Sequence, residues 1–420
     1  MEFRFHGGAG EVGGSCIEVR SRGIRVALDY GIKIEDEVRF DKLPEKLDAV
    51  IISHAHLDHS GGLFNLAKSK TVIVGSEATR DVAVELLYDM ARIQRMKRNG
   101  FLFGRRDVTR LKRRWWAREA VALPGMEIKL YPAGHVLGAK MIGVKAEGKN
   151  VLYTGDFCLH DSEIMEGADV TRLPKEPDVL IMESTYGGKV RPDRRDLVKR
   201  LIGEVLAATE RNGNVLIPVF AFNRLQEMAK RLDQAMMDGS LPYYNSYLIS
   251  SLASKITRHF TRHKNLLKED LRSQSAPFAY RHLSRIKSLE RIEEPAIVIC
   301  TPGFAHAGCS RRLLTEWMVN EANSVIVSSG YLPPESPLKV AMEKGELIED
   351  EGKLVMRASM EQVELSGHAD QRELVKLVKT LKPKKVFLVH GEPDQIQILA
   401  ENIDGLTEVV VPRNGDRFTI

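Results

Sequence analysis

The stretch that decides the fold is His54-Ala55-His56-Leu57-Asp58-His59, which directly follows the apolar run Ala49–Ser53. Side chains two residues apart on an extended backbone point the same way, so the first two histidines can present their imidazoles to one metal ion. The aspartate and the last histidine follow where the chain turns, and they can face a second metal nearby. Imidazole and carboxylate without thiolate suit zinc better than manganese or iron. The alternative is a polar loop whose histidines only form hydrogen bonds.

Further ligand-type residues stand at the ends of other short apolar strands. His135 follows a strand at Ile128–Tyr131, Asp156 ends the strand that begins at Val151, and His390 ends the strand that begins at Lys385. Open α/β sheets place their sites at the carboxyl ends of their strands. Each of these residues alone could be an ordinary loop residue, but together with the histidine cluster they indicate a single centre.

The chain as a whole alternates short β-branched runs with helical stretches, which is typical of an α/β sheet covered on both faces. The opening differs, because Met1–Phe5, Ser15–Val19 and Arg25–Leu28 are joined by glycine-rich turns and are expected to pair antiparallel. A segment with its own alternation interrupts the ligand-type motifs, which predicts a domain inserted into another. The expected domains are 1–190, 191–360 and 361–420, and the expected helices include Glu77–Met96, Arg195–Glu210, Arg224–Asp238 and Asp370–Leu381.

Composition narrows the class of protein further. Of the 420 residues, 43% are hydrophobic and 28% are charged, which is close to the average of soluble globular proteins and excludes wholesale disorder. No apolar run approaches the roughly 20 residues that a bilayer requires, and the N-terminus lacks a secretory signal. The four cysteines form no CxxC pair, so we expect neither a disulfide scaffold nor a cysteine-only zinc site. We therefore expect a cytoplasmic protein with no membrane partner.

A basic run between Arg92 and Arg118 is the most uneven feature of the charge distribution. The formal net charge is only +5, but this run contains a single acid, Asp107, and the adjacent Trp115 and Trp116. We expect its arginines to contact nucleic-acid phosphates and its tryptophans to pack inside the protein. The alternatives are a solvated helix face for the arginines and stacking on bases for the tryptophans. The arginines singled out are Arg105, Arg106, Arg113 and Arg114.

The motifs taken together resemble a known family. His54-Ala55-His56-Leu57-Asp58-His59 is the HxHxDH signature of metallo-β-lactamase-fold hydrolases. Glu183 in Met182-Glu183-Ser184-Thr185-Tyr186-Gly187, His368 in Ser366-Gly367-His368-Ala369-Asp370, and His390-Gly391-Glu392 look like the three motifs of the β-CASP branch. That branch comprises nucleic-acid-processing nucleases. The segments 133–139 and 152–157 are similar to its archaeal cleavage and polyadenylation specificity factor-like subgroup rather than to ribonuclease J.

The resemblance implies an α/β fold, a metallo-β-lactamase αββα sandwich with an inserted α/β β-CASP domain. It also implies two zinc ions per chain, one held by His54, His56 and His135 and the other by Asp58, His59 and His390, with Asp156 bridging. Asp58 would also belong to the catalytic set. Asp29, in Leu28-Asp29-Tyr30-Gly31, matches the family's first motif and would orient a ligand imidazole. A structural role for Asp29 in its turn is the alternative.

Catalytic and substrate-binding roles also come from the resemblance. His368 would protonate the leaving 3′-oxygen, and Glu183 would fix its ring and favour the protonated form. A histidine at a helix cap and a strand-end carboxylate are the ordinary alternatives. Substrate contacts are expected from Arg224 and Ser310-Arg311 in the inserted domain, where Ser310 could equally be the N-cap of a helix over Arg311–Val319.

The expected function is that of a zinc-dependent ribonuclease in RNA processing or decay. We favour 5′-to-3′ exonuclease activity, because the sequence shows no module that would read a cleavage site. The alternatives are an endonuclease of RNA 3′-end processing, a DNA-repair nuclease of the same fold, and a non-catalytic RNA-processing scaffold. The expected partner is RNA, with a homodimer or an RNA-processing complex as the possible assembly.

Overall fold

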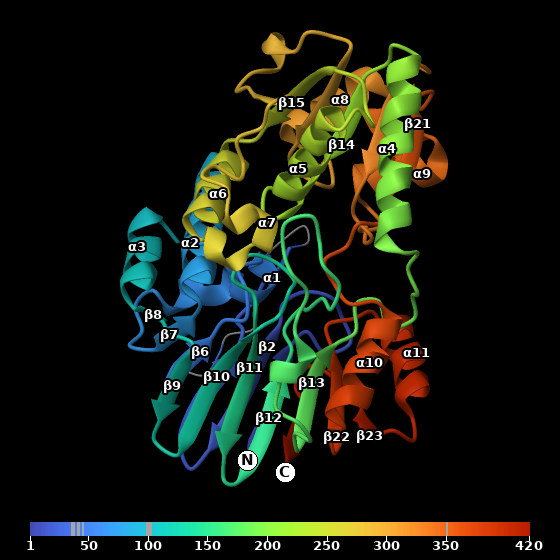
Figure 1. Cartoon of the computed structure of the whole chain (residues 1–420). Coiled ribbons are helices and arrows are strands. Elements are labelled where there is room, and N and C mark those ends of the chain that lie inside the picture. The colour runs from blue at the N-terminus through green and yellow to red at the C-terminus, as the bar shows by residue number, and fades with distance from the viewer. Residues whose placement is uncertain (35–37, 40–42, 44–45, 98–102, 350–351) are drawn as a thin grey trace. The chain divides into compact units, whose positions relative to one another are not determined.

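The computed structural model describes residues 1–34, 38–39, 43, 46–97, 103–349 and 352–420. The chain divides into two compact units. Unit 1 consists of Met1–Arg191 and Gly367–Ile420, and unit 2 is the intervening segment Pro192–Ser366. The first unit is therefore built from two separate parts of the sequence, and the second from one continuous part (Figure 1). Among the described residues, no helix is both long enough and apolar enough to cross a bilayer.

Unit 1 contains two seven-stranded sheets. The first sheet has the order β24 (Arg417–Thr419), β1 (Glu2–Gly7), β2 (Cys16–Ser21), β3 (Ile24–Leu28), β6 (Ala49–Ile51), β7 (Val72–Gly75) and β8 (Trp115–Ala117). The second has the order β23 (Glu408–Val410), β22 (Lys385–Val389), β13 (Val179–Glu183), β12 (Lys149–Tyr153), β11 (Lys140–Ala146), β10 (Met126–Pro132) and β9 (Ala120–Leu123). The antiparallel pairing predicted for the opening strands is confirmed, since β2 pairs antiparallel with both β1 and β3.

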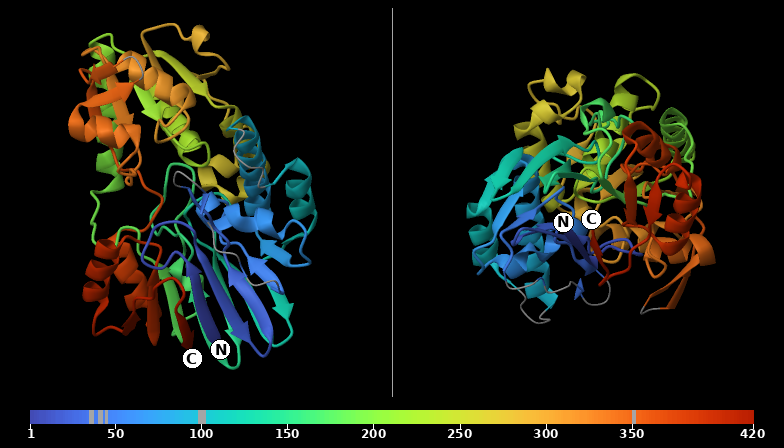
Figure 2. Two further views of the ribbon diagram at one scale, coloured as in Figure 1. Left: turned by 180° about the vertical axis from the view of Figure 1, so that it is seen from behind. Right: turned by 90° about the horizontal axis from the view of Figure 1, so that it is seen from below.

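The two sheets pack face to face over one apolar core. Phe5 of β1 lies with its ring centroid 5.3 Å from that of Phe387 of β22, so strands from the two ends of the chain meet across the core. Helices cover the outer faces, with α2 and α3 beside the first sheet and α10 and α11 beside the second (Figures 1 and 2). This is the αββα sandwich expected from the sequence. Its helices are α1 (Leu57–Ser60), α2 (Glu77–Lys97), α3 (Arg105–Arg113), α10 (Gln371–Leu381) and α11 (Pro393–Ile403).

Unit 2 is built on a six-stranded parallel sheet. Its order is β16 (Ser284–Arg285), β15 (Asn245–Ile249), β17 (Ala296–Cys300), β14 (Val215–Pro218), β18 (Ser324–Val327) and β21 (Ser359–Gln362). Successive side chains of a strand point to opposite faces, so Val215 and Ile217 join one apolar cluster and Leu216 joins the other. The longer helices are α4 (Arg194–Glu210), α5 (Arg224–Met237), α6 (Ser251–Arg262), α8 (Gly308–Trp317) and α9 (Pro337–Lys344).

Strand direction explains where the polar residues of unit 1 gather. Strands β3 and β6 run parallel, as do β12, β13 and β22, so their carboxyl ends lie at one edge of each sheet. Asp29 follows β3, His54 follows β6, and His390 follows β22. The buried apolar strands fix the backbone up to these points, and the polar side chains begin where the strands end.

Candidate metal centre

The ligand-type residues predicted from the sequence come together in unit 1. They form two groups that share Asp156, and within each group the ligand atoms all lie within 4.8 Å of one another. The first group is His54, His56, His135 and Asp156, and the second is Asp58, His59, Asp156 and His390. The two groups match the division into two sites that the family resemblance implies.

In the first group, unprotonated ring nitrogens of the histidines face one another. Ser53 Oγ donates a hydrogen bond to Asp29 and therefore accepts one from His54 Nδ1 at 3.0 Å, which leaves the Nε2 of neutral His54 without a proton. His135 Nδ1 donates to the Gly367 carbonyl oxygen at 2.7 Å, which leaves its Nε2 unprotonated as well. Both Nε2 atoms face His56 Nδ1, at 3.0 and 3.2 Å. A single proton on His56 satisfies only one of them, so the arrangement fits a cation better than a hydrogen-bonded cluster.

The second group contains buried polar atoms with no hydrogen-bond partner. His390 Nδ1 contacts Ser15 Oγ at 2.8 Å, and its Nε2 has no hydrogen-bond partner. Asp156 Oδ1, 3.7 Å from that Nε2, has none either. Buried polar atoms are rarely left unsatisfied, and here they surround a position that a cation would fill. The residues of both groups therefore fit two divalent metal ions with imidazole and carboxylate ligands.

Burial keeps the three imidazoles of the first group neutral, whereas in the second group burial is outweighed by the carboxylates of Asp156, Asp58 and Asp29, which raise the pKa of His59 well above its usual value. Burial lowers the pKa of His54 and of His135 well below the usual range, and neighbouring histidines add to the effect. Burial likewise lowers the pKa of His56 to about 4. Burial alone would raise the pKa of Asp156, but His390, His59 and His368 outweigh it and hold that pKa well below its usual value. Neutral imidazole and ionised carboxylate are the forms that bind metals.

Asp29 is a fully buried hub beside this centre. Its Oδ2 accepts hydrogen bonds from His59 Nδ1 at 2.7 Å and from the Tyr153 hydroxyl at 2.8 Å, and its Oδ1 accepts one from the backbone N–H of Ser53 at 2.7 Å. Its φ of 60° lies in the left-handed region, which non-glycine residues seldom adopt. Asp29 thus orients a histidine of the cluster and shapes its own turn, so both roles considered for it are present.

Glu183 and His368 form a pair next to the centre. His368 Nδ1 lies 2.9 Å from Glu183 Oε2 and 3.9 Å from Asp156 Oδ2. Glu183, at the end of β13, is buried and accepts further hydrogen bonds from the Phe157 N–H at 2.8 Å and the Thr185 hydroxyl at 2.6 Å. Burial would lower the pKa of His368, but the Glu183 and Asp156 carboxylates raise it above its ordinary value. The Glu183 carboxylate accepts the hydrogen bond of Nδ1–H and so fixes the orientation of the ring.

Three residues that support the centre were not predicted from the sequence. Ser15, Ser53 and the carbonyl of Gly367 each bind the nitrogen of a cluster histidine that faces away from the other ligands. Serine and a glycine carbonyl are too common in loops to be singled out. Ser53 and Gly367 gave a usable hint, since they directly precede His54 and His368, whereas Ser15 stands next to no residue assigned to the site.

The inserted-domain residues predicted to bind substrate are engaged within unit 2. Ser310 is fully buried and its hydroxyl donates to the Pro302 carbonyl oxygen at 2.6 Å. The helix-cap alternative is wrong, because α8 begins at Gly308 with Ala307 as its N-cap. Arg224 forms an ion pair with Glu227, and Arg311 forms one with Glu349 at 2.6 Å. These side chains act first as internal contacts of the α/β unit, and the structure presents no free Ser310 hydroxyl to a phosphate.

The basic run covers the end of α2, helix α3 and the edge strand β8, and its residues differ in exposure. Arg105, Arg106 and Arg113 are exposed on the helix, whereas Arg114 is half-buried and donates to the Leu66 and Ser69 carbonyl oxygens. Arg114 is therefore a structural contact rather than part of an open basic surface. The prediction that the tryptophans pack inside holds for Trp115, which is 7% exposed, and is wrong for Trp116, which is 44% exposed. Part of the run, residues 98–102, lies outside the described residues.

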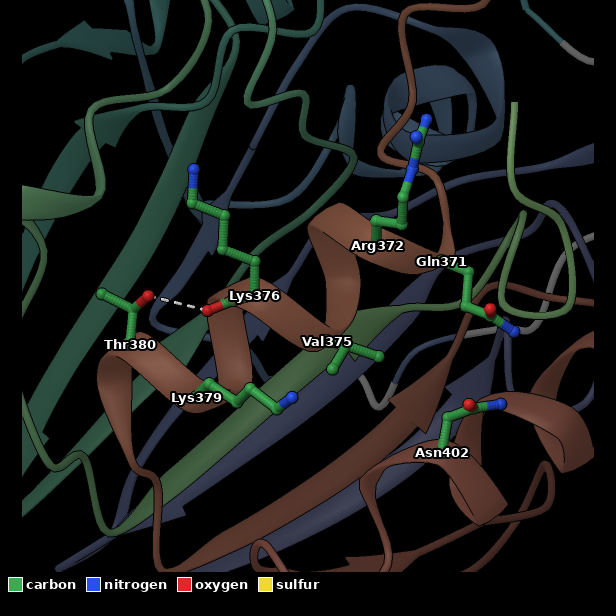
Figure 3. Close-up of a pocket in the computed structure, with 7 residues that line it drawn as sticks. All are labelled: Gln371, Arg372, Val375, Lys376, Lys379, Thr380 and Asn402. Carbon is green, nitrogen blue, oxygen red and sulfur yellow. Dashed lines mark hydrogen bonds between the residues drawn. The ribbon is translucent and has the colours of Figure 1, made fainter. Parts of the chain in front are cut away.

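A shallow pocket of about 460 Å³ lies on the outer side of unit 1 between α10 and α11 (Figure 3). Arg372, Lys376 and Lys379 line it from successive turns of α10, and Asn402 lines it from α11. Arg372 is paired with Asp370 at 2.8 Å, while both lysines are exposed. The cations that line this pocket are spread at helical spacing rather than in a run, so the sequence alone gives no sign of it.

The fold and the two ligand groups define a metallo-hydrolase of the metallo-β-lactamase superfamily that carries a β-CASP insertion. Family models match the chain as Metallo-beta-lactamase superfamily over residues 9–217, Beta-Casp domain over 225–336, and Zn-dependent metallo-hydrolase RNA specificity domain over 353–412. The chain belongs to this family.

Individual relatives agree with the family models. The chain is 31% identical to Integrator complex subunit 11 of Danio rerio, over 98% of the chain and 73% of that protein. It is 29% identical to the Probable RNase MJ4 of Methanocaldococcus jannaschii over the whole of both chains. Other curated relatives are longer, and the chain spans 47–60% of the first three matched. A solved structure from Enterococcus faecalis V583, described as a protein of unknown function, shares the fold, with a TM-score of 0.61 and 16% identity over 100% of this chain and 99% of that one.

Proposed function

We propose that the protein is a zinc-dependent ribonuclease that hydrolyses RNA phosphodiester bonds at a two-metal centre. The observation that carries the proposal is the convergence of two ligand groups on Asp156, with the His368–Glu183 pair beside them. The match to an RNA specificity domain and the relatives named as RNases support RNA as the substrate. Two bound zinc ions would activate a water molecule and stabilise charge on the phosphoryl oxygens.

The residues of the chain supply the remaining steps. His54, His56 and His135 would hold one ion, Asp58, His59 and His390 the other, and Asp156 would bridge them. His368, held through Nδ1 by Glu183, would donate the proton on Nε2 to the leaving 3′-oxygen. Glu183 is a positioning residue in this scheme, because it contacts the histidine and not the substrate.

The proposal has two forms, which differ in whether the enzyme is an exonuclease or an endonuclease. Our first form is 5′-to-3′ exonuclease activity, as expected from the sequence. The second is internal cleavage, which is favoured by the name of a 31% identical relative, the Endoribonuclease YSH1 of Mycosarcoma maydis. We propose RNA as the partner, and either a homodimer or membership of an RNA-processing complex as the assembly, since relatives are named as subunits of such complexes.

Product analysis tests the proposal. The purified chain is analysed for bound metal and then incubated with end-labelled 5′-monophosphate RNA, 5′-triphosphate RNA and DNA of the same sequence. Mononucleotides from the 5′-monophosphate substrate support trimming, and discrete fragments support internal cutting. Cleavage of DNA alone would favour a repair nuclease, and metal-loaded protein inactive on every substrate would favour a scaffold. His282→Ala, a histidine of unit 2, is the matched control for His368→Ala.

A further inference from the structure

A second cluster of ligand-type side chains lies in unit 1, outside the two groups that share Asp156. It consists of Cys158, His160 and Glu373, whose ligand atoms lie within 4.8 Å of one another. Cys158 and His160 belong to the loop that follows β12, and Glu373 stands in the first turn of α10. The cysteine is buried and the other two side chains are partly exposed. Nothing in the proposed nuclease reaction uses these residues.

The distances within the cluster match one coordination shell. Cys158 Sγ lies 3.3 Å from His160 Nδ1, and that nitrogen lies 3.1 Å from each carboxylate oxygen of Glu373. In tetrahedral zinc sites the metal is about 2.3 Å from sulfur and about 2.0 Å from nitrogen or oxygen, so neighbouring ligand atoms are about 3.3–3.5 Å apart. The Cys158–His160 and His160–Glu373 separations are thus close to those of one zinc shell, and the third pair, Cys158 and Glu373, lies within 4.8 Å.

The backbone on both sides holds the cluster in place. Cys158 donates its N–H to the Ala133 carbonyl at 2.9 Å and accepts from the Ala168 N–H at 2.7 Å. Glu373 Oε2 accepts the Asp370 N–H at 3.2 Å, the reciprocal half of a capping box at the start of α10. The guanidinium of Arg191, 3.9 Å from the same Oε2, also faces the carboxylate. With the arginine charge included, a thiolate, a carboxylate and a divalent cation leave a net charge of about +1, which a partly exposed site tolerates.

We propose that Cys158, His160 and Glu373 form a further zinc site, with solvent as the fourth ligand. Its mixed sulfur, nitrogen and oxygen donors suit zinc, and they distinguish it from the centre at Asp156, which has no sulfur ligand. The site connects the loop after Asp156 to the helix that follows His368. Both Asp156 and His368 have central roles in the proposed reaction. It is a positioning device and contributes no group to the reaction.

Cobalt substitution tests this site independently of nuclease activity. The full chain is stripped of metal, reloaded with Co²⁺ and examined by absorption spectroscopy, where a cobalt–thiolate bond gives a charge-transfer band in the near ultraviolet. We expect this band in the wild type and in Cys309→Ser, a cysteine of unit 2, and we expect Cys158→Ser to abolish it. Elemental analysis of zinc-loaded protein should show one metal ion per chain fewer in Cys158→Ser and in Glu373→Gln, which keeps an oxygen for the helix cap.

The outcomes separate this site from the centre at Asp156. A thiolate band that persists when His54→Ala removes a ligand of the other centre supports the proposal even if the chain proves to be no nuclease. Absence of the band in the wild type, or its survival in Cys158→Ser, overturns the proposal. Circular dichroism on every variant establishes folding, and Glu373→Gln gives a second measure if Cys158→Ser does not fold. An unchanged metal count in folded Glu373→Gln also contradicts it.

Discussion

At the scale of single residues, hydrogen bonds determine which ring nitrogen of a cluster histidine can bind a metal ion. Asp29, Ser53, Ser15 and the Gly367 carbonyl occupy one nitrogen of each of four imidazoles, so the other nitrogen is directed into the centre. His368 differs, because its Nδ1 is held by Glu183. The Glu183 carboxylate thus distinguishes His368 from the histidines of the two ligand groups.

His368→Ala should lower kcat on RNA by roughly 10²–10⁴-fold while both metal ions remain bound, because the leaving 3′-oxygen loses its proton donor. A phosphodiester with a nitrophenol leaving group needs little protonation, so its hydrolysis should fall far less. The measurement is kcat for both substrates, with metal content determined on the same samples. An equal loss on both substrates would mean that His368 acts on structure or metal binding rather than as an acid.

Asp29→Asn should weaken binding of the metal held by His59 by roughly 10–100-fold, since the amide no longer offers a charged acceptor to His59 Nδ1. Asparagine tolerates the left-handed backbone at this position, so the turn is kept. Competition with a chelator of known affinity measures the change. Tyr153→Phe, which removes one other hydrogen bond to the same carboxylate, is the control and should have a smaller effect.

At the scale of elements, the strands and their ends were predictable, and the partners of charged side chains were not. Buried strands are recognised by their continuous apolar runs, so strands β6, β13 and β22 could be placed from the sequence. The residues at or after their ends could then be placed too, namely His54, Glu183 and His390. Long helices with a clear period were also predicted to within about a residue. The edge strand β8 was missed because its two tryptophans follow a helix rich in arginine.

Pairing of charges within a unit is a feature that the sequence did not reveal. Arg224, Arg311 and Arg114 look like substrate contacts in a sequence, yet each is bound to an acid or a carbonyl oxygen of its own unit. The type of a residue shows what it is able to bind, and only the fold shows which partner is near. The cluster at Cys158 could not be predicted from the sequence either, because the fold alone brings Glu373, 215 positions later (373 − 158), next to Cys158.

Helix α3 gives a prediction about RNA binding. Arg105, Arg106 and Arg113 are exposed, and changing all three to glutamine should reduce the slope of log affinity against log salt by about 2, since each phosphate neutralised on a single strand adds about 0.7 to that slope. The measurement is RNA affinity at several salt concentrations. Lys376→Gln with Lys379→Gln, in the pocket of Figure 3, removes two charges elsewhere on unit 1; this control should leave the slope unchanged. An unchanged slope in the arginine variant would remove α3 from the binding surface.

Strands β1 to β3 carry a buried charge network that makes stability depend on pH. Burial would raise the pKa of Glu18, but hydrogen bonds from His6 at 3.0 Å and Arg25 at 2.6 Å lower it from 4.5 to about 2. The ionised Glu18 carboxylate therefore adds about 2 kcal/mol to the free energy of unfolding, after allowance for solvent screening at the partly exposed Arg25. This stabilisation is fully present above pH 4.5 and is lost as the pH falls toward 2.

Urea unfolding of the wild type and Glu18→Gln at a series of pH values measures this contribution. The two proteins should differ in free energy of unfolding at pH 7, and the difference should shrink as the pH falls from 4.5 toward 2. A difference that stays constant across this range would show that the Glu18 charge is not stabilised by its neighbours.

At the scale of the whole molecule, the centre joins the two sequence segments of unit 1. The expected ligand residues include one, His390, that follows the insertion, and the sheets join the same segments through β24 with β1 and β22 with β13. A bound metal would therefore stabilise a connection made across the 175 residues of unit 2 (Pro192–Ser366). Unit 2 itself contributes no member of either ligand group among the described residues.

Removal of the metal should act on one unit only. With free zinc at about 1,000 times its dissociation constant, bound metal contributes about 4 kcal/mol, which chelation removes. Hydrogen exchange should then become faster in β6 and β22 of unit 1 and remain unchanged in β17 of unit 2. Equal acceleration in β17 would contradict separate stabilisation of the two units.

The division of unit 1 also sets an order of events during synthesis. The nascent chain delivers every segment of unit 2 before it delivers β22, so the intervening α/β unit can fold while its host still lacks three strands of its two sheets. The histidine that closes the second ligand group emerges from the ribosome after all the others. Until then the second ligand group is incomplete, so the full set of ligand residues exists only once translation has passed residue 390.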